Sequence, residues 1–272
     1  MTDAPLVLAT LEGYAVEGGF DGSREPATCY SPTIALGRHP GPGAADGLWR
    51  DYERVIDLVP ELGLDGVRLT VEWARVEPRP GVVDVSALER YAQVARHARA
   101  LGLHVTVVLV DAVWPSWLGL EAWLLPWVLP RAIEHSTRVV AHLRECVTGV
   151  VAVANPSAMI EAGYLTGAAP PWRRGARSDA AAALGHLARM TDALRADPVV
   201  GPLLVTSSAT IALTSSVSDM AERRRSASDC AEIHVRSLVR GAGPTRSRAA
   251  LLVHHGDRWS VGEVSPLLAA LR

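Results

Sequence analysis

The 272-residue sequence contains no lysine: all 27 residues in the Lys+Arg class are arginines. A chain without lysine cannot form a Schiff base with a substrate or with pyridoxal phosphate, and it has no Walker A lysine. Those mechanisms are therefore excluded for this chain. The formal net charge is −2, so the basic excess typical of nucleic-acid-binding proteins is also absent. We expect no nucleic-acid partner.

Cysteine and long apolar runs are scarce as well. The three cysteines, Cys29, Cys146 and Cys230, are widely spaced and form no CxxC pair, which argues against a disulfide framework and a zinc site. No apolar run reaches about 18 residues, and the first residues lack a basic stretch followed by an apolar one. We therefore expect a cytoplasmic protein with no membrane contact and no metal.

Apolar segments of two kinds alternate along the chain. Short continuous runs predict buried strands, and longer runs with helical spacing, several ended by glycine, predict helices. The expected strands cover residues 5–11, 67–76, 104–110, 149–154, 203–207 and 249–254. The expected helices cover 48–62, 85–101, 130–146, 179–196, 220–239 and 265–271. This alternation favours parallel strands with helices outside, in a single α/β domain over residues 1–272.

Two architectures share this alternation, an open doubly wound sheet and a (β/α) barrel. A dinucleotide-binding sheet needs a glycine-rich turn after its first strand. Residues 41–47 contain glycines, but their spacing is wrong and Pro42 lacks an N–H, so no dinucleotide cofactor is expected. We predict a TIM-type barrel, either complete or shortened to fewer than eight strands. An incomplete barrel would expose a sheet edge for a second copy or a partner enzyme.

Several motifs follow one another in the order found in a known enzyme family. The segment Val67-Arg-Leu-Thr-Val-Glu-Trp-Ala-Arg-Val-Glu-Pro78 is similar to the second-strand motif Tyr-Arg-Phe-Ser-Ile-Ser-Trp-Ser-Arg of glycoside hydrolase family 1, the β-glucosidase family. Further matches are Tyr14-Ala-Val-Glu-Gly18, Trp114-Pro-Ser-Trp-Leu118, Trp123 and Gly163-Tyr-Leu-Thr-Gly-Ala-Ala-Pro170. The resemblance covers about residues 9–200. Residues 200–272 diverge from the family.

The departures from the family concern its chemistry. Family members carry Asn-Glu-Pro after the fourth strand, with the Glu as acid/base, whereas this chain has Asn155 followed directly by Pro156. The family's sugar-binding Gln and His fall at Ala15 and Asp111, and its nucleophile motif Thr/Ser-Glu-Asn-Gly has no counterpart. Retaining glycosidases need both carboxyl groups. The resemblance thus implies the fold, but not the usual hydrolysis of β-glucosides.

Barrel chemistry takes place where strands end and loops begin, and this rule selects candidate residues. The catalytic candidates are two carboxylates, Glu72 and Asp111, and two histidines that end the last expected strand, His254 and His255. Glu72 could instead pair with Arg68 or Arg75, and Asp111 could only hydrogen-bond its loop. Because both arginines are close in sequence to Glu72, we favour Asp111 as the carboxyl group with the raised pKa.

The substrate-binding candidates are chosen by position and by residue type. They are Arg68, Asn155, Glu17 and two tryptophans, Trp114 and Trp172, whose rings could stack on a sugar. Asn155 could otherwise satisfy strand-end backbone, the tryptophans could be packing residues, and Glu12 could replace Glu17 in the pocket. Glu161, close in sequence to the missing Glu, is a candidate displaced acid. We expect Arg68, Glu72, Asp111 and Asn155 to converge at one end of the strands.

Three functions are compatible with this pattern. The first is an enzyme that binds a sugar or polyol-like small molecule and has repurposed acid/base chemistry. The second is a non-catalytic relative that binds carbohydrate or a partner enzyme, and the third is a purely structural subunit. Fold alone does not choose among them.

Overall fold

The computed structural model describes residue 6, residues 8–20 and residues 26–205. Its sheet contains β1 (Leu8–Leu11), β2 (Gly66–Thr70), β3 (His104–Val110), β4 (Gly149–Val153) and β5 (Leu204–Val205). All neighbouring strands pair in parallel, in the sequential order β1-β2-β3-β4-β5. A doubly wound sheet would reverse this order, so the predicted barrel-type fold is confirmed. The five described strands form an open sheet.

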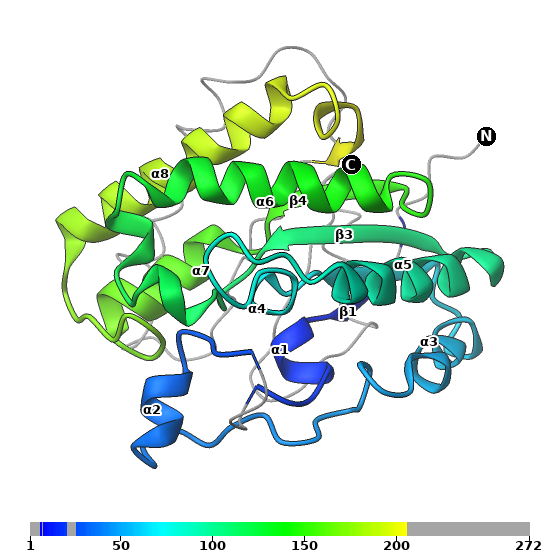
Figure 1. The fold of residues 1–272 in the computed structure, drawn as a ribbon, viewed down its shortest axis with the longest axis horizontal. Coiled ribbons are helices and arrows are strands. Elements are labelled where there is room, and N and C mark those ends of the chain that lie inside the picture. Colours follow the sequence, from blue (N-terminus) through cyan, green and yellow to red (C-terminus); the bar gives the residue numbers. More distant parts are fainter. Residues whose placement is uncertain (1–5, 7, 21–25, 206–272) are drawn as a thin grey trace, which may run out of the picture.

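Four longer helices connect or follow the strands: α3 (Tyr52–Glu61), α5 (Val85–Ala100), α6 (Val128–Leu143) and α8 (Arg177–Ala196). Figure 1 shows α5 and α6 lying along β3. The Asp84 carboxylate caps the first turn of α5 by accepting the Ala87 N–H at 3.0 Å. Gly102, just after the C-terminal end of α5, has a φ of 79°, a left-handed conformation that glycine adopts without strain.

Short helices directly follow several strands. They are α1 (Gly13–Val16) after β1, α4 (Trp73–Val76) after β2 and α7 (Pro156–Ile160) after β4. The remaining short elements are α2 (Ser31–Ala35), η1 (Ser116–Leu118), η2 (Ala122–Leu124), the π-helical η3 (Glu161–Thr166) and η4 (Gly201–Leu203). The short helices bring their residues close to the strand ends.

The second strand is shorter than its sequence predicts. The expected strand 67–76 ends at Thr70, and residues 73–76 form α4 instead. The Glu72 carbonyl accepts the N–H groups of Arg75 and Val76, which closes the helical turn. Trp73 and Val76 are buried in this helix, so their apolar side chains are explained without a strand. Arg68 and Glu72 therefore do not share the face of one strand.

The two faces of the sheet carry different side chains. Val67, Leu69, Val105 and Val107 belong to the main core with residues of the helices. Their neighbours alternate to the opposite, inner face. A separate cluster of Val108, Val151, Ala154 and Val205 forms apart from the main core. Arg68 lies on the inner face, in register with Thr10 and Thr106.

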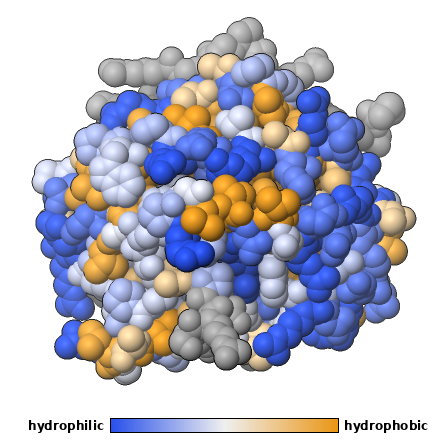
Figure 2. Space-filling model, in the orientation of Figure 1, coloured by the Kyte–Doolittle hydropathy of each residue, from blue (hydrophilic) through white to orange (hydrophobic). Residues whose placement is uncertain are grey.

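The surface mixes polar and apolar residues. On the face shown in Figure 2, hydrophobic residues gather near the centre among hydrophilic ones. Within the described ranges, no helix is long and apolar enough to span a membrane. The expected elements 220–239, 249–254 and 265–271, with His254 and His255, lie outside the described residues.

Candidate functional site

Polar side chains meet at the carboxyl ends of β1, β2 and β3. Thr10 pairs with Arg68 and Leu11 with Leu69, so Glu12, in extended conformation after β1, lies level with Thr70. The Thr70 hydroxyl donates to Oδ2 of Asp111, which follows β3, at 3.0 Å. Glu12, Arg68, Thr70 and Asp111 are called the strand-end group below.

Arg68 reaches across the inner face of the sheet. From β2 its Nη2 donates to the carbonyl oxygen of Ala154, at the end of β4, at 3.1 Å. Burial lowers the pKa of Arg68, while the negative charges of Asp111 and Glu12 oppose that shift. The guanidinium stays charged, as arginine does in proteins. It is half-buried and so retains contact with solvent.

The two carboxylates of the strand-end group differ in their surroundings. Asp111 is half-buried, and its Oδ1 accepts the Ala112 N–H at 2.7 Å while Oδ2 accepts Thr70. Glu12 is exposed, yet surrounding protein desolvates it enough to raise its pKa. The Asp111 charge adds to this rise, and the Arg68 charge opposes it. Asp111 is thus oriented by the protein, and Glu12 faces solvent.

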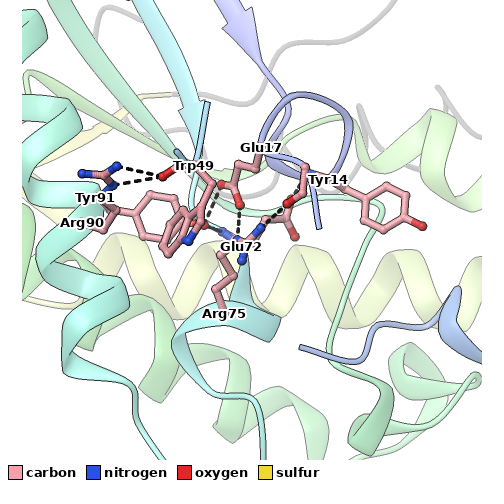
Figure 3. A network of polar contacts seen from close by, with 8 residues as sticks. Tyr14, Glu17, Trp49, Glu72, Arg75, Arg90 and Tyr91 are labelled. Atoms are coloured by element: carbon pink, nitrogen blue, oxygen red, sulfur yellow. Dashed lines mark hydrogen bonds and ion pairs between the residues drawn. The ribbon is translucent and has the colours of Figure 1, made fainter. Parts of the chain in front are cut away.

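A second polar network is buried beneath α1 (Figure 3). Arg75 forms an ion pair with Oε2 of Glu17 and also donates to the Gly18 carbonyl. The Tyr91 hydroxyl donates to Oε1 of Glu17 at 2.7 Å and accepts the Glu72 N–H at 3.1 Å. The Glu72 Oε1 accepts the Tyr14 N–H at 2.8 Å. Glu17, Glu72, Arg75 and Tyr91 are called the buried network below.

Aromatic rings complete the enclosure of Arg75. Its guanidinium carbon lies 4.0 Å from the ring centroid of Phe20 and 4.2 Å from that of Trp49. Cation–π contacts of this kind stabilise a desolvated arginine by about 2 kcal/mol. The contacts of Arg75 therefore stabilise the interior of the protein.

The distribution of the arginines differs from the pairing on which we based the preference for Asp111 as the acid. Arg75 forms its ion pair with Glu17, and Arg68 acts electrostatically on Asp111 and Glu12. Desolvation, followed by the charges of Glu17 and Asp111, raises the pKa of Glu72 well above its ordinary value. The argument that arginines would pair with Glu72 therefore no longer favours Asp111. However, Glu72 is only 2% exposed.

Two expected substrate-binding residues, Glu17 and Trp114, are buried in the structure. Glu17 is buried, and both of its carboxylate oxygens accept hydrogen bonds from the buried network. Trp114 is 1% exposed, and its Nε1 donates to the Gly119 carbonyl at 2.8 Å. A buried ring cannot stack on a sugar, so the structure gives Trp114 a packing role and Glu17 an ion-pairing role.

The other expected residues remain at least partly exposed. Asn155 is half-buried and caps α7 by accepting the Ala158 N–H at 3.3 Å. Trp172 is half-buried, with its ring centroid 5.7 Å from that of Tyr30 and 6.1 Å from that of His39. Glu161 is half-buried at the start of η3. Their roles at a ligand stay predictions.

Sequence reasoning missed Thr70 and Tyr91. Thr70 follows Arg68 by two residues, and the period of a strand places both on the inner face, so its position was accessible from the sequence. Tyr91 comes from α5, and no sequence pattern links it to Glu17. Within the described residues, no group of three or more His, Cys, Asp or Glu side chains could hold a metal ion.

Comparisons with known proteins support the resemblance to β-glucosidases. No family model matches the chain. It is 28% identical over 172 residues to Beta-glucosidase 21 of Oryza sativa subsp. japonica, covering 61% of this chain and 33% of that protein. Over 179 residues it is 25% identical to the Beta-glucosidase of Agrobacterium sp., covering 65% and 39%. The chain thus spans only about a third of the length of these curated relatives.

Solved structures share the fold. A beta-glycosidase from Pyrococcus horikoshii superposes with a TM-score of 0.72 at 19% identity, covering 93% of this chain and 62% of that one. A beta-glucosidase from Exiguobacterium marinum gives a TM-score of 0.69 at 15% identity, covering 98% and 75%. The predicted resemblance to the β-glucosidase family is confirmed, and the fold is of the same barrel type.

Proposed function

We propose that the chain binds a sugar or a sugar-like polyol at the carboxyl ends of its strands, with Arg68, Asp111 and Asn155 as contacts. The strand-end group carries this proposal, because it gathers a guanidinium and two carboxylates, all at least partly exposed, around the buried Thr70 hydroxyl. Ligands of (β/α) barrels bind at this end. The β-glucosidases that the chain resembles are named for sugar substrates.

The chemistry of these groups suits hydroxyl-rich ligands. A carboxylate accepts hydrogen bonds from hydroxyl groups, a guanidinium donates them, and an amide does both. Asp111 keeps its orientation through Thr70 and Ala112, so a ligand meets a preorganised acceptor. We include Trp172, which is half-buried, as a stacking surface at the edge of this site.

The proposal does not include the usual retaining mechanism. That mechanism needs an acid and a nucleophile about 5–5.5 Å apart. Asn155 is followed directly by Pro156, which opens α7, and no carboxyl group lies between them. Any acid/base chemistry would have to come from other residues, such as Asp111, Glu161 or, outside the described residues, His254 and His255.

A non-catalytic binding role is the second candidate, and the burial of Glu72 favours it. Glu72 has a strongly raised pKa, as a general acid would need, yet it is only 2% exposed and its Oε1 already accepts the Tyr14 N–H. A general acid must come within hydrogen-bond reach of the atom that it protonates. In this second role the chain would bind carbohydrate or a partner enzyme without turnover.

Two measurements test the proposal. Titration of the full chain with methyl β-glucoside, followed by NMR, should show saturable shifts, and Asp111→Asn should weaken the affinity at least ten-fold. Absence of sugar binding, or unchanged binding by a folded Asp111→Asn variant, would contradict the proposal.

The second measurement concerns catalysis. Hydrolysis of p-nitrophenyl β-glucoside should stay at background. Robust turnover that disappears in Glu161→Gln would show that a displaced acid has replaced the missing Glu, and would refute the non-catalytic alternative.

A further inference from the structure

We infer that the strand-end site prefers neutral and cationic sugars, such as amino sugars, over anionic ones, and that Glu12 sets this preference. The inference rests on the sugar binding proposed above and narrows its ligand class. It depends on the position of Glu12 relative to Thr70 and Asp111, and on the balance of charges around Arg68.

The strand register places two carboxylates around one hydroxyl. Thr10 is paired with Arg68 and Leu11 with Leu69, so Glu12, which directly follows β1, lies level with Thr70. Glu12 has extended backbone angles, φ −73° and ψ 112°, which continue the alternation of β1 and keep its side chain on the inner face. On the other side of Thr70, Asp111 accepts its hydroxyl at 3.0 Å.

The charges of this group do not cancel. Glu12 and Asp111 supply two negative charges, and Arg68 supplies one positive charge. The Arg68 guanidinium also donates one of its hydrogen bonds to the Ala154 carbonyl. The adjacent buried network adds no compensating cation, because Arg75 is paired with Glu17. A phosphate or carboxylate on the ligand would face this excess of negative charge, whereas an ammonium group would be attracted by it.

Glu12 is the most exposed member of the strand-end group. Both carboxylate oxygens of Asp111 accept hydrogen bonds from the protein. Glu12 is exposed, and within the described part of the chain its carboxylate has no hydrogen-bond or ion-pair partner. An ammonium group on a bound sugar would therefore find its strongest unoccupied acceptor at Glu12.

Calorimetric titrations of the full chain at pH 7 and low ionic strength test this inference. The ligands are methyl β-glucoside, methyl β-glucosaminide and methyl β-glucuronide, which differ mainly in charge. The glucosaminide should bind about 5- to 10-fold more tightly than the glucoside. This is the effect expected from one additional charge–charge contact in a partly hydrated site. The glucuronide should bind most weakly.

Variants then assign the preference to one residue. Glu12→Gln should remove most of the advantage of the glucosaminide over the glucoside. Glu12→Asp, which keeps the charge, should retain the preference, and Glu61→Gln, an exposed site at the end of α3, should have no effect.

The outcomes separate this inference from the proposed function. Binding of the three sugars with equal affinity, or a preference that survives Glu12→Gln, would overturn the inference and leave the sugar site standing. Failure of all three ligands to bind would overturn the proposed function itself.

Discussion

The buried network and the strand-end group lie close together but use their charges differently. In the buried network, Arg75 and Glu17 pair within the interior, with side chains 4% and 0% exposed, and Tyr91 satisfies the remaining Glu17 oxygen. In the strand-end group, Arg68 and Asp111 are half-buried and Glu12 faces solvent. The Arg75–Glu17 pair is satisfied within the protein, while the strand-end group keeps capacity for a ligand.

This difference separates residues that build the fold from residues that can bind. A buried ion pair is costly to break, since its desolvated partner is left without compensation. A half-exposed charged group can replace its contacts with protein or water by contacts with a ligand, at a small cost in free energy. Changes in the buried network should therefore alter stability, and changes in the strand-end group should alter binding.

The largest expected loss follows from breaking the buried ion pair. Arg75→Met leaves the Glu17 carboxylate buried without its partner and should destabilise the protein by about 3–5 kcal/mol. Arg131→Met, which removes an exposed ion pair with Glu134, should cost less than about 1 kcal/mol. Urea denaturation measures both. Equal losses of stability in the two variants would contradict the distinction between the buried and the exposed ion pair.

A pH titration of stability extends the comparison to a buried residue outside both regions. Burial, with a smaller contribution from Arg138, lowers the pKa of His135 from 6.5 to about 3. A folded-state pKa below the unfolded one means that the unfolded chain binds more protons between these values. Stability should therefore fall as pH drops from about 6.5 towards 3, by up to about 1.4 kcal/mol per pH unit from this residue.

The His135→Phe variant isolates that contribution. Phenylalanine can keep the stacking on Trp73, whose ring centroid lies 4.8 Å from that of His135. Its thermal stability should depend less steeply on pH in this window than that of the unmodified protein. Parallel curves for the two proteins would assign the acid sensitivity to other groups.

Gly13 tests how tightly the buried network is packed. A Cβ added there would lie 2.5 Å from Cγ of Glu72 and 2.8 Å from Oε1 of Glu17. Gly13→Ala should therefore destabilise the protein by about 1–3 kcal/mol through overpacking. Gly185→Ala in α8, where the nearest atom is 3.8 Å away, should instead stabilise it by up to about 1 kcal/mol. Thermal melts of the pair distinguish crowding from helix propensity.

The smallest change in stability is expected when the buried carboxyl group loses its charge. Burial and the negative charges of Glu17 and Asp111 raise the pKa of Glu72, so its protonated form is favoured in the folded state. Such a group contributes stability at low pH and loses it as pH rises through the folded pKa. Glu72→Gln, which resembles the protonated acid, should keep stability at pH 7 within about 1 kcal/mol and flatten its decline above pH 4.5.

The fold was more accessible to sequence reasoning than the charge pairing. The third strand was predicted at 104–110 and is observed at His104–Val110, because a run of β-branched residues ends at a polar side chain. The second strand was predicted too long, because Trp73 and Val76 are buried in a helix as they would be in a strand. Burial sets the apolar pattern, and that pattern alone does not mark where a strand turns into a helix.

The positions of the strand-end residues could be predicted from the sequence, but their charge pairing could not. The rule that strand ends carry the chemistry selected Glu12, Asp111 and Asn155. It did not reveal that Arg75 pairs with Glu17, because these residues are 58 positions apart and their contact depends on how α1 and α4 pack. Proximity in sequence suggested Glu72 as the partner of the arginines. The three-dimensional structure was needed to assign these charges.

The most direct test of the separation between the two regions compares Asp111→Asn with Glu72→Gln. Affinity for methyl β-glucosaminide is measured by calorimetry, and folding is checked by circular dichroism in both variants. We predict that Asp111→Asn loses at least ten-fold in affinity with its stability nearly unchanged, whereas Glu72→Gln binds within about two-fold of the unmodified protein. Full binding by Asp111→Asn together with loss of binding by a folded Glu72→Gln would contradict the account.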